Sequence, residues 1–352
     1  RGHTTALYNA SLRRARQENK RVLYWVDNVV FPEWTWDQGS YRNPPSKERY
    51  EEAALYLVYY AKYLIARHGI PIHAVNIMNE PDKNGHHFSG LQSLQFAAVL
   101  REKLDEAGLY GIRIAPGAPL KHYFYNDQVE ALFQNPELQQ STDIVAIHHF
   151  YTYVKTLRRD KVPLHLRLWI SSGAYWYFVP GSYKYDMGPP ENVDETVRMN
   201  TWHLGAGANM AGIWQIANRV GWPPSGEGFM SLPADWDAYS SGNHYQIDGG
   251  AAVYPYVRPG MFILKGSMGN YSKEDYSVDA YGGRGHPEAI VISNNSEKRS
   301  VSLDLHNCSA SRFTIVQCRA RAAKETLGVH IPRNERIELD IPANSVTVCI
   351  AD

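Results

Sequence analysis

Glu80 stands where an apolar stretch ends abruptly, in the segment AVNIMNEPD that spans residues 74–82. The stretch predicts a buried strand, and Pro81 ends that strand because proline has no backbone N–H for a neighbouring strand. Glu80 is then the last side chain before the chain leaves the sheet, with the amide of Asn79 beside it. A carboxylic acid at the carboxyl end of a barrel strand is a candidate general acid. The alternative is a strand-ending glutamate that caps the following helix.

Adjacent histidines, His148 and His149, occur in a second apolar stretch, DIVAIHHF at residues 143–150. This stretch also predicts a strand, and successive side chains of a strand point to opposite faces. No third ligand is spaced nearby, so the pair does not indicate a metal site. The sequence contains no other pattern that indicates a cofactor.

The composition excludes some classes of partner. Lys plus Arg and Asp plus Glu both number 36, so the 352-residue chain has zero net charge. A nucleic acid or an anionic membrane would require a basic surface, so neither is an expected partner. Aromatic residues make up 12% of the chain, with 24 Tyr and 9 Trp. Their flat rings suit the packing of sugars, although Tyr and Trp are also ordinary core residues.

Three cysteines, Cys308, Cys318 and Cys349, lie near the C-terminal end of the sequence. Their number and spacing indicate neither a disulfide framework nor a metal site. Two alternatives remain: two of them form one disulfide, or all three are buried free thiols. No apolar run reaches the ~18 residues of a membrane-spanning helix, and no signal-peptide pattern opens the sequence. We therefore expect no membrane span.

Alternating strands and helices must position Glu80. Six strands are predicted, starting near residues 21, 72, 112, 143, 164 and 211, with helices between them. Such βαβ units predict an α/β fold with a parallel sheet, but a TIM (β/α)8-type barrel needs eight strands. Either two strands escape detection, or the first two βα units lie upstream of residue 1. We favour the second explanation, in which an N-terminal segment or a second chain completes the barrel.

From about Asn270 the pattern changes to short alternating runs separated by Asn, Gly and Pro turns. Such runs predict an antiparallel β-sandwich. We therefore expect a barrel domain over residues 1–266 and a β-sandwich domain over residues 267–352.

Several segments together resemble family 30 of the glycoside hydrolases, within the clan of retaining enzymes with TIM barrels. Asn79-Glu80-Pro81 is similar to the acid/base signature of the clan. The segment VFPEWTW at residues 30–36 is similar to a Pro-x-Trp segment after the third strand, and His149-Phe150-Tyr151 matches a His-x-Tyr after the sixth. Trp214 matches a Trp of the eighth strand, and IPANSVTVCI at residues 341–350 resembles the closing strand of the side β-domain.

The resemblance implies a retaining mechanism, which needs two carboxyl groups about 5–5.5 Å apart. Glu80 supplies the acid/base, but the nucleophile of the family ends the seventh strand in a motif like Trp-x-Ser-Glu-Gly. This chain has WISSG at residues 169–173, so Ser172 stands where the resemblance implies glutamate. A neutral serine hydroxyl is too weak a nucleophile without a base.

Three explanations of Ser172 remain open: an engineered replacement of the nucleophile, a natural departure, or a wrong register of the motif. A natural departure includes a pseudoenzyme and an enzyme that recruits another carboxylate. The candidates for such a carboxylate lie in loops, and each is also explained as a solvated charge: Glu33, Asp186, Glu191 and Glu227.

The other expected site residues contact the sugar or the nucleophile. Asn79 is expected to bind the 2-hydroxyl, and Tyr151 to hold the carboxylate of the nucleophile. The remaining expected substrate contacts are His148, His149, Asp27, and the stacking residues Trp25, Trp34 and Trp214.

The sequence therefore predicts a retaining β-glycosidase that acts on an oligosaccharide, polysaccharide or glycoconjugate, with hydrolysis absent or slow because of Ser172. The alternative is a carbohydrate-binding pseudoenzyme. Because hydrolases of polysaccharides are usually exported or lysosomal, the resemblance leads us to expect a secreted, lysosomal or periplasmic protein. No cofactor and no metal are expected.

Overall fold

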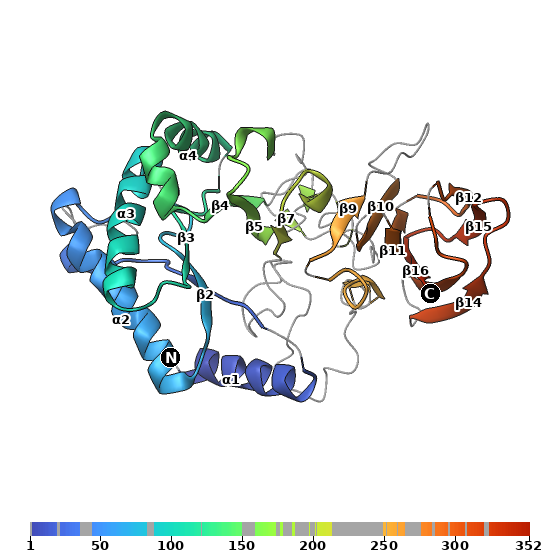
Figure 1. The fold of residues 1–352 in the computed structure, drawn as a ribbon, viewed down its shortest axis with the longest axis horizontal. Helices are drawn as coiled ribbons and strands as arrows, with labels where there is room; N and C mark the ends of the chain where they lie inside the picture. The colour runs from blue at the N-terminus through green and yellow to red at the C-terminus, as the bar shows by residue number, and fades with distance from the viewer. Residues whose placement is uncertain are drawn as a thin grey trace. The chain divides into compact units, whose positions relative to one another are not determined.

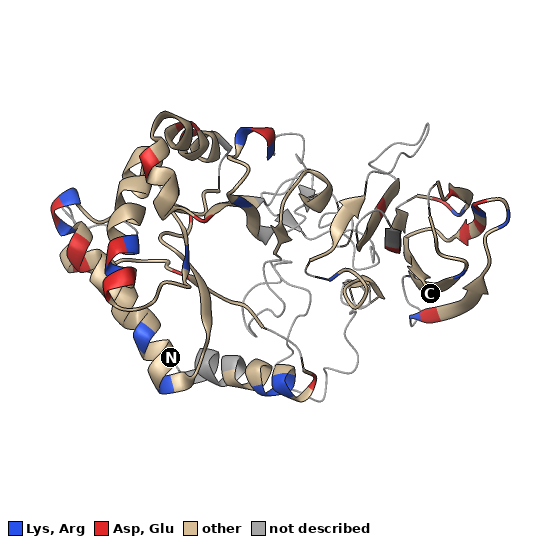
Figure 2. Ribbon diagram, viewed as in Figure 1, with Lys and Arg blue, Asp and Glu red and all other residues tan. Residues whose placement is uncertain are grey.

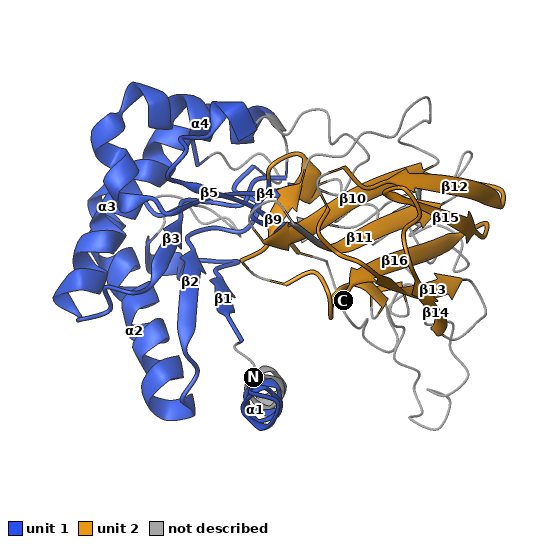
Figure 3. Cartoon of the chain, turned by 45° about the vertical axis from the view of Figure 1, so that its right-hand side comes forward, with its two compact units in different colours: residues 1–149, 158–171, 208–210 blue, residues 150–157, 172–207, 211–352 orange. Residues whose placement is uncertain are grey.

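The structure is a computed structural model of the 352-residue chain (Figure 1). It describes residues 2–19, 22–35, 44–82, 88–120, 122–149, 159–173, 177–178, 185–186, 197, 201, 203–212, 249–250, 252–258, 260–264, 276–283, 286–294, 296–306, 308–319 and 324–352. The chain folds into two compact units (Figure 3). Unit 1 comprises residues 1–149, 158–171 and 208–210, and unit 2 comprises residues 150–157, 172–207 and 211–352. The predicted division between residues 266 and 267 stays a prediction.

All six predicted barrel strands are present in two three-stranded sheets. The first sheet has the order β1 (Tyr24–Asp27), β2 (Ile72–Asn76), β3 (Arg113–Ala115), and the second has the order β4 (Ile144–His149), β5 (Arg167–Gly173), β8 (Met210–Ala211). Strands β1, β2 and β3 pair in parallel. The backbone N–H of Asp143 donates to the carbonyl of Ile114 at 3.0 Å, which links β3 to the start of β4. The six strands therefore neighbour one another in the order in which they occur in the sequence, as predicted for a barrel.

Helices connect these strands, as the sequence predicts. They are α2 (Tyr50–His68), α3 (Gly90–Glu106) and α4 (His122–Gln134), which lie between successive strands from β1 to β4, while α1 (Gly2–Gln17) precedes β1. Short 3-10 turns occur at Glu33–Thr35, Lys47–Arg49, Pro136–Ser141 and Arg159–Lys161. Helix α2 ends where Gly69 adopts a left-handed backbone with φ of 63°, a conformation that glycine adopts without steric cost.

The core of unit 1 lies between helices α2 and α3 and the outer face of the first sheet. Alternate residues of β2 point to opposite faces, so Val75 packs outward against the helices while Ala74 points into the barrel. The ring of Phe96 on α3 meets Phe31 and Tyr50 edge to face, at centroid distances of 5.5 and 5.2 Å. Such pairs stabilise the contact beyond the area that they bury.

Unit 2 contains the predicted antiparallel β-sandwich. One sheet has the order β14 (Glu325–His330), β13 (Phe313–Arg319), β16 (Ser345–Ala351), β11 (His286–Asn294), β10 (Tyr276–Gly283), β9 (Phe262–Leu264), and the other pairs β12 (Arg299–Asp304) with β15 (Arg336–Ile341). The two sheets share a core, to which Phe313 and Ile315 contribute from one sheet and Leu303 and Leu339 from the other.

The structure departs from the sequence-based prediction in three places. The sequence of residues 256–266 predicts a last short helix, but residues 262–264 form strand β9 at the edge of the larger sheet. Strand β14 was not predicted, because Gly328 (φ 116°) interrupts a run whose apolar side chains point to solvent. A two-stranded antiparallel pair of β6 (Tyr177–Phe178) and β7 (Tyr185–Asp186) was not predicted either.

All three cysteines are free thiols, so the disulfide alternative is wrong.

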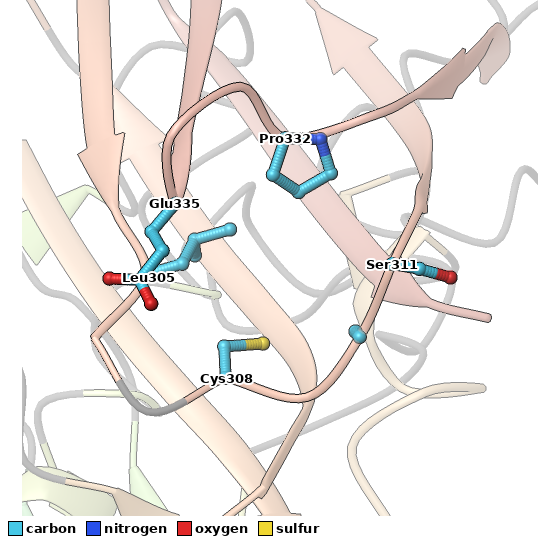
Figure 4. A pocket seen from close by; sticks show the side chains of 6 residues that line it. Leu305, Cys308, Ser311, Pro332 and Glu335 are labelled. Carbon is cyan, nitrogen blue, oxygen red and sulfur yellow. The ribbon is translucent and has the colours of Figure 1, made fainter.

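Charged residues of both signs lie on the surface of unit 1. In unit 1, most charged residues lie on the helices, with both signs interspersed (Figure 2). In the β-sandwich, a cavity of about 250 Å³ is lined by Leu305, Cys308, Ala310, Ser311, Pro332 and Glu335 (Figure 4). Among the described helices, none is long and apolar enough to cross a membrane.

Candidate active site at the carboxyl ends of the barrel strands

Polar side chains form a layer at the carboxyl ends of the barrel strands. An inner apolar cluster contains Trp25 of β1, Ala74 of β2, Ala146 of β4 and Trp169 of β5. Side chains two residues apart share a face of a strand. Two residues beyond these four positions, on the same inner face, the chain places polar residues: Asp27, Asn76, His148 and Ser171. On the inner face of each of these four strands, an apolar side chain is therefore followed by a polar side chain nearer the carboxyl end.

Glu80 is held above this layer by a strained backbone. Its φ is 49°, in the left-handed region that residues other than glycine rarely adopt. Backbone hydrogen bonds fix it, because the N–H of Glu80 donates to Ala118 at 3.0 Å and that of Ala118 donates to Met78 at 3.1 Å. Strain of this kind costs free energy and is often found at functional sites.

The carboxyl group of Glu80 faces an imidazole. Oε1 of Glu80 lies 3.3 Å from Nδ1 of His148, and the two residues are only 7% and 2% exposed. The N–H of His148 donates to the carbonyl of Pro119 at 2.9 Å, which fixes the histidine from the neighbouring segment. His148 therefore orients the carboxyl group that the sequence identifies as the candidate acid.

Glu80 does not cap the following helix. Ser89 is the N-cap of α3, where its hydroxyl accepts from the N–H of Gln92 and the Gln92 side chain accepts from the N–H of Ser89. This reciprocal capping box satisfies the first turn of the helix. The alternative role of Glu80 as a helix cap is therefore wrong.

Asn79 presents a polar atom that lacks a partner among the residues that the structure describes. Its N–H donates to the carbonyl of Asn28 at 2.8 Å, which fixes its backbone, and the residue is 8% exposed. Within the described part of the chain, Oδ1 of Asn79 has no hydrogen-bond partner. Buried polar atoms are normally satisfied, so this amide oxygen retains hydrogen-bonding capacity that the described residues do not use.

Asp27 brings a second carboxyl group to the same end of the barrel. Its Oδ1 accepts a hydrogen bond of 2.6 Å from Nδ2 of Asn76, the residue opposite it in the strand register. Desolvation is the largest influence on this carboxyl and raises its pKa, while the hydrogen bond from Asn76 and the charge of His148 oppose the rise. The negative charge of Glu80 raises the pKa of Asp27 further. Asp27, Glu80 and His148 are therefore electrostatically coupled.

Asp27→Asn is expected to stabilise the protein at neutral pH. Because the folded-state pKa of Asp27 is raised, its contribution to stability is complete below the unfolded pKa and is lost as pH rises through the folded pKa. Asparagine keeps an acceptor for Asn76 and carries no charge. The melting temperature of the variant should therefore exceed that of the wild type at pH 7, and the difference should shrink towards pH 4. Glu130→Gln, on the exposed face of α4, is the control and should show no such trend; equal destabilisation at every pH would contradict the account.

The aromatic residues expected to stack on sugar differ in position. The ring of Trp25 packs against Trp169 at 5.2 Å inside the barrel, and the ring of His73 stacks on the same tryptophan at 6.1 Å. Trp34, in the turn Glu33–Thr35, is 56% exposed. Trp25 thus contributes to the inner core, whereas the ring of Trp34 is free to contact a ligand.

Four expected site residues are described partly or not at all. His149 and Ser172 lie in strands β4 and β5, but their side chains lie outside the described set. Tyr151 and Trp214 lie outside the described residues, and their roles stay predictions.

Sequence reasoning missed two polar residues of the inner layer, Asn76 and Ser171. Asn76 is fully buried, and within the described chain its Oδ1 and the hydroxyl of Ser171 have no hydrogen-bond partner. The signal for Asn76 was present, because an amide interrupts the apolar run AVNIM at a position that alternation places on the face of Ala74.

Known proteins resemble this chain in structure. No protein-family model and no curated protein sequence matches the chain. Among solved structures, a glycoside hydrolase family 30 (GH30) endoxylanase from Clostridium papyrosolvens C71 superposes with a TM-score of 0.72 at 16% identity, covering 100% of this chain and 84% of the other.

Two further structures are similar over most of their length. The catalytic domain of GH30 xylanase C from Talaromyces cellulolyticus has a TM-score of 0.70 at 16% identity, covering 96% of this chain and 78% of the other. A conserved exported protein from Bacteroides fragilis has a TM-score of 0.71 at 15% identity, with coverage of 96% and 78%. The chain therefore has the GH30-like glycoside hydrolase fold, a TIM barrel with an antiparallel β-domain.

Proposed function

We propose that this protein is a glycosidase of the retaining type whose hydrolysis is absent or very slow because Ser172 replaces the nucleophile. The observation that carries the proposal is the pairing of Glu80 with His148, next to Asn79, whose amide oxygen has no partner among the described residues. The fold supports it at a coarser level, since the similar structures are glycoside hydrolases.

Each residue has a definite task in this proposal. Glu80 protonates the glycosidic oxygen as the bond to the anomeric carbon breaks, and later removes a proton from the attacking water. Asn79 donates or accepts a hydrogen bond at the 2-hydroxyl, a contact that strengthens in the transition state. A carboxylate at position 172 would attack the anomeric carbon, which a neutral serine cannot do unaided.

A β-linked xylan fragment is the first substrate to test, because the similar structures include GH30 xylanases. Export from the cell is the localisation we propose, since one similar structure is described as an exported protein.

Asn79→Ala is expected to weaken binding of a xylo-oligosaccharide by about 5- to 20-fold, because a hydrogen bond contributes about 1 kcal/mol or more. Isothermal titration calorimetry with the otherwise unaltered chain measures the effect without requiring turnover. Asn135→Ala, remote in sequence after helix α4, is the matched control. Unchanged affinity in Asn79→Ala, or no binding of any neutral oligosaccharide by the folded wild type, would contradict the proposal.

The second candidate function is a carbohydrate-binding pseudoenzyme. Ser172 itself favours it, because the same site can bind sugar without a nucleophile. The two candidates share the Asn79 result and differ in their response to Ser172→Glu.

A further inference from the structure

Adjacent carbonyls of one segment bind both members of the Glu80–His148 pair. The N–H of Glu80 donates to the carbonyl of Ala118 at 3.0 Å, and the N–H of His148 donates to the carbonyl of Pro119 at 2.9 Å. Ala118 and Pro119 are buried and follow strand β3 in the chain. The distance of 3.3 Å between the carboxyl group of Glu80 and the imidazole of His148 therefore depends on where this segment, residues 118–120, is held.

The segment is tied to the chain on both sides of Glu80. Before Glu80, the carbonyl of Met78 accepts a hydrogen bond of 3.1 Å from the N–H of Ala118. After Glu80, Oδ1 of Asp82 accepts a hydrogen bond of 2.9 Å from the N–H of Leu120. Asp82 is fully buried, and a hydrogen bond to a carboxylate is stronger than one between neutral groups. Asp82 therefore anchors the Leu120 end of the segment.

The segment has few hydrogen-bond donors with which to hold its position. Pro119 has no backbone N–H, so the segment donates only from Ala118 and Leu120, on either side of the proline. Met78 accepts from the first donor and Asp82 from the second. Loss of the Asp82 carboxylate would thus release one of the two hydrogen bonds that the segment donates.

The strained backbone of Glu80 requires a well-held neighbour. Its φ of 49° persists only where the surrounding contacts determine it. Packing around the segment is close, because a Cβ at Gly117 would lie 2.9 Å from Nε2 of Gln128 on α4 and 3.3 Å from Cγ of Pro81. Glycine at position 117 thus lets the chain lie against Pro81, the residue between Glu80 and Asp82.

We propose that Asp82 is a positioning residue of the proposed glycosidase site, whose carboxylate holds residues 118–120 and thereby sets the distance between Glu80 and His148. This inference rests on the proposed function and names a further part of the same site. Asp82 acts through Leu120 and does not need to touch the substrate. Its loss should displace the acid without removing it.

The first test is ¹⁵N NMR of the imidazole of His148, in the otherwise unaltered chain with ¹⁵N-labelled histidine and the signal assigned by its loss in His148→Gln. The chemical shift of Nδ1 reports the contact with Glu80, and Glu80→Ala gives the reference for loss of that contact. In Asp82→Ala, we expect the Nδ1 signal to move towards this reference. In Asp82→Asn, which keeps an acceptor for Leu120, we expect the signal of the wild type. An unmoved signal in Asp82→Ala, or a shift of equal size in Asp82→Asn, would overturn the proposal.

Asp143→Ala is the matched control. Oδ2 of Asp143 accepts from the N–H of Ile114 at 2.9 Å, the same kind of bond at the same distance, where strand β4 begins. Its loss should lower the melting temperature, as Asp82→Ala does, but leave the His148 signal in place. A shift in Asp143→Ala as large as that in Asp82→Ala would mean a general loosening of the barrel and would contradict a specific role of Asp82.

A second measurement, on the wild type, covers variants that do not fold. Amide groups that open together in one cooperative unit have similar protection from hydrogen exchange. The N–H groups of Leu120, Glu80 and His148 should therefore be protected to a similar degree. Much weaker protection of Leu120 than of Glu80 would show that Asp82 does not hold the segment.

The catalytic test uses the Ser172→Glu background. There we expect Asp82→Ala to lower kcat on a xylo-oligosaccharide by about 10- to 100-fold, with KM changed less, because small misplacements of a reacting group are costly. Asp82→Asn should restore most of the rate, and a change in KM alone would overturn the proposal. If Ser172→Glu itself shows no turnover, the proposed function is contradicted, while the NMR test still decides whether Asp82 positions Glu80.

Discussion

Ser172→Glu is expected to raise hydrolysis of an aryl β-glycoside by on the order of 10³-fold or more, because loss of a covalent nucleophile costs rates of this size or larger. The variant places a carboxylate where the resemblance implies the nucleophile, in strand β5 of the barrel. The measurement is release of nitrophenol from a panel of aryl β-glycosides, xyloside and glucoside included, by the variant and by the unaltered chain.

The matched control for this experiment is Ser302→Glu, at an exposed position of strand β12, which should leave hydrolysis unchanged. Ser171→Glu, one residue earlier on β5, tests the register of the motif. It adds the same charge at a neighbouring position and should give no gain. A gain in Ser171→Glu instead would show that the register of the motif is displaced by one residue. No gain in either folded variant would favour the pseudoenzyme over the hydrolase.

Glu80→Gln, made in the Ser172→Glu background, is expected to reduce turnover of an unactivated glycoside by about 10²- to 10⁴-fold, the usual contribution of general acid catalysis. Glutamine keeps the shape of the side chain beside His148 but carries no proton of the required acidity. An aryl glycoside with a strongly acidic phenol as leaving group needs little protonation, so its rate of bond cleavage should fall much less.

The comparison between leaving groups distinguishes the acid from a structural residue. Glu106→Gln, in the exposed last turn of α3, is a control that should change neither rate. An equal loss on both kinds of substrate would mean that Glu80 supports the fold or binding of the site and is not the acid.

The parts of the fold set by local pattern could be predicted from sequence. Strand β2 follows from its apolar run, and the start of α3 follows from the capping pair of Ser89 and Gln92. These signals lie within a few residues of the features that they determine. The prediction that this strand runs to Glu80 and is ended by Pro81 is wrong, because β2 ends at Asn76 and Asn79 pairs with Ala118 only as an isolated bridge.

The parts set by contacts distant in sequence could not be predicted. The hydrogen bond between Asp27 and Asn76 joins residues 49 positions apart, and His148 lies 68 positions from Glu80. The left-handed backbone of Glu80 is held by the segment around Ala118, which no local pattern reveals. Strand β9 was mistaken for a helix because three residues carry too little periodicity to separate the two.

The central proposal is that Glu80 acts as the acid/base and that a carboxylate at position 172 acts as the nucleophile. The most direct test is covalent trapping in Ser172→Glu with 2-deoxy-2-fluoro glycosides that carry a good leaving group, followed by peptide mass spectrometry. The account predicts one glycosyl adduct per chain, on the peptide that contains residue 172, with Asp27 unmodified. An adduct on another residue, or hydrolysis by the variant without any adduct at residue 172, would contradict it.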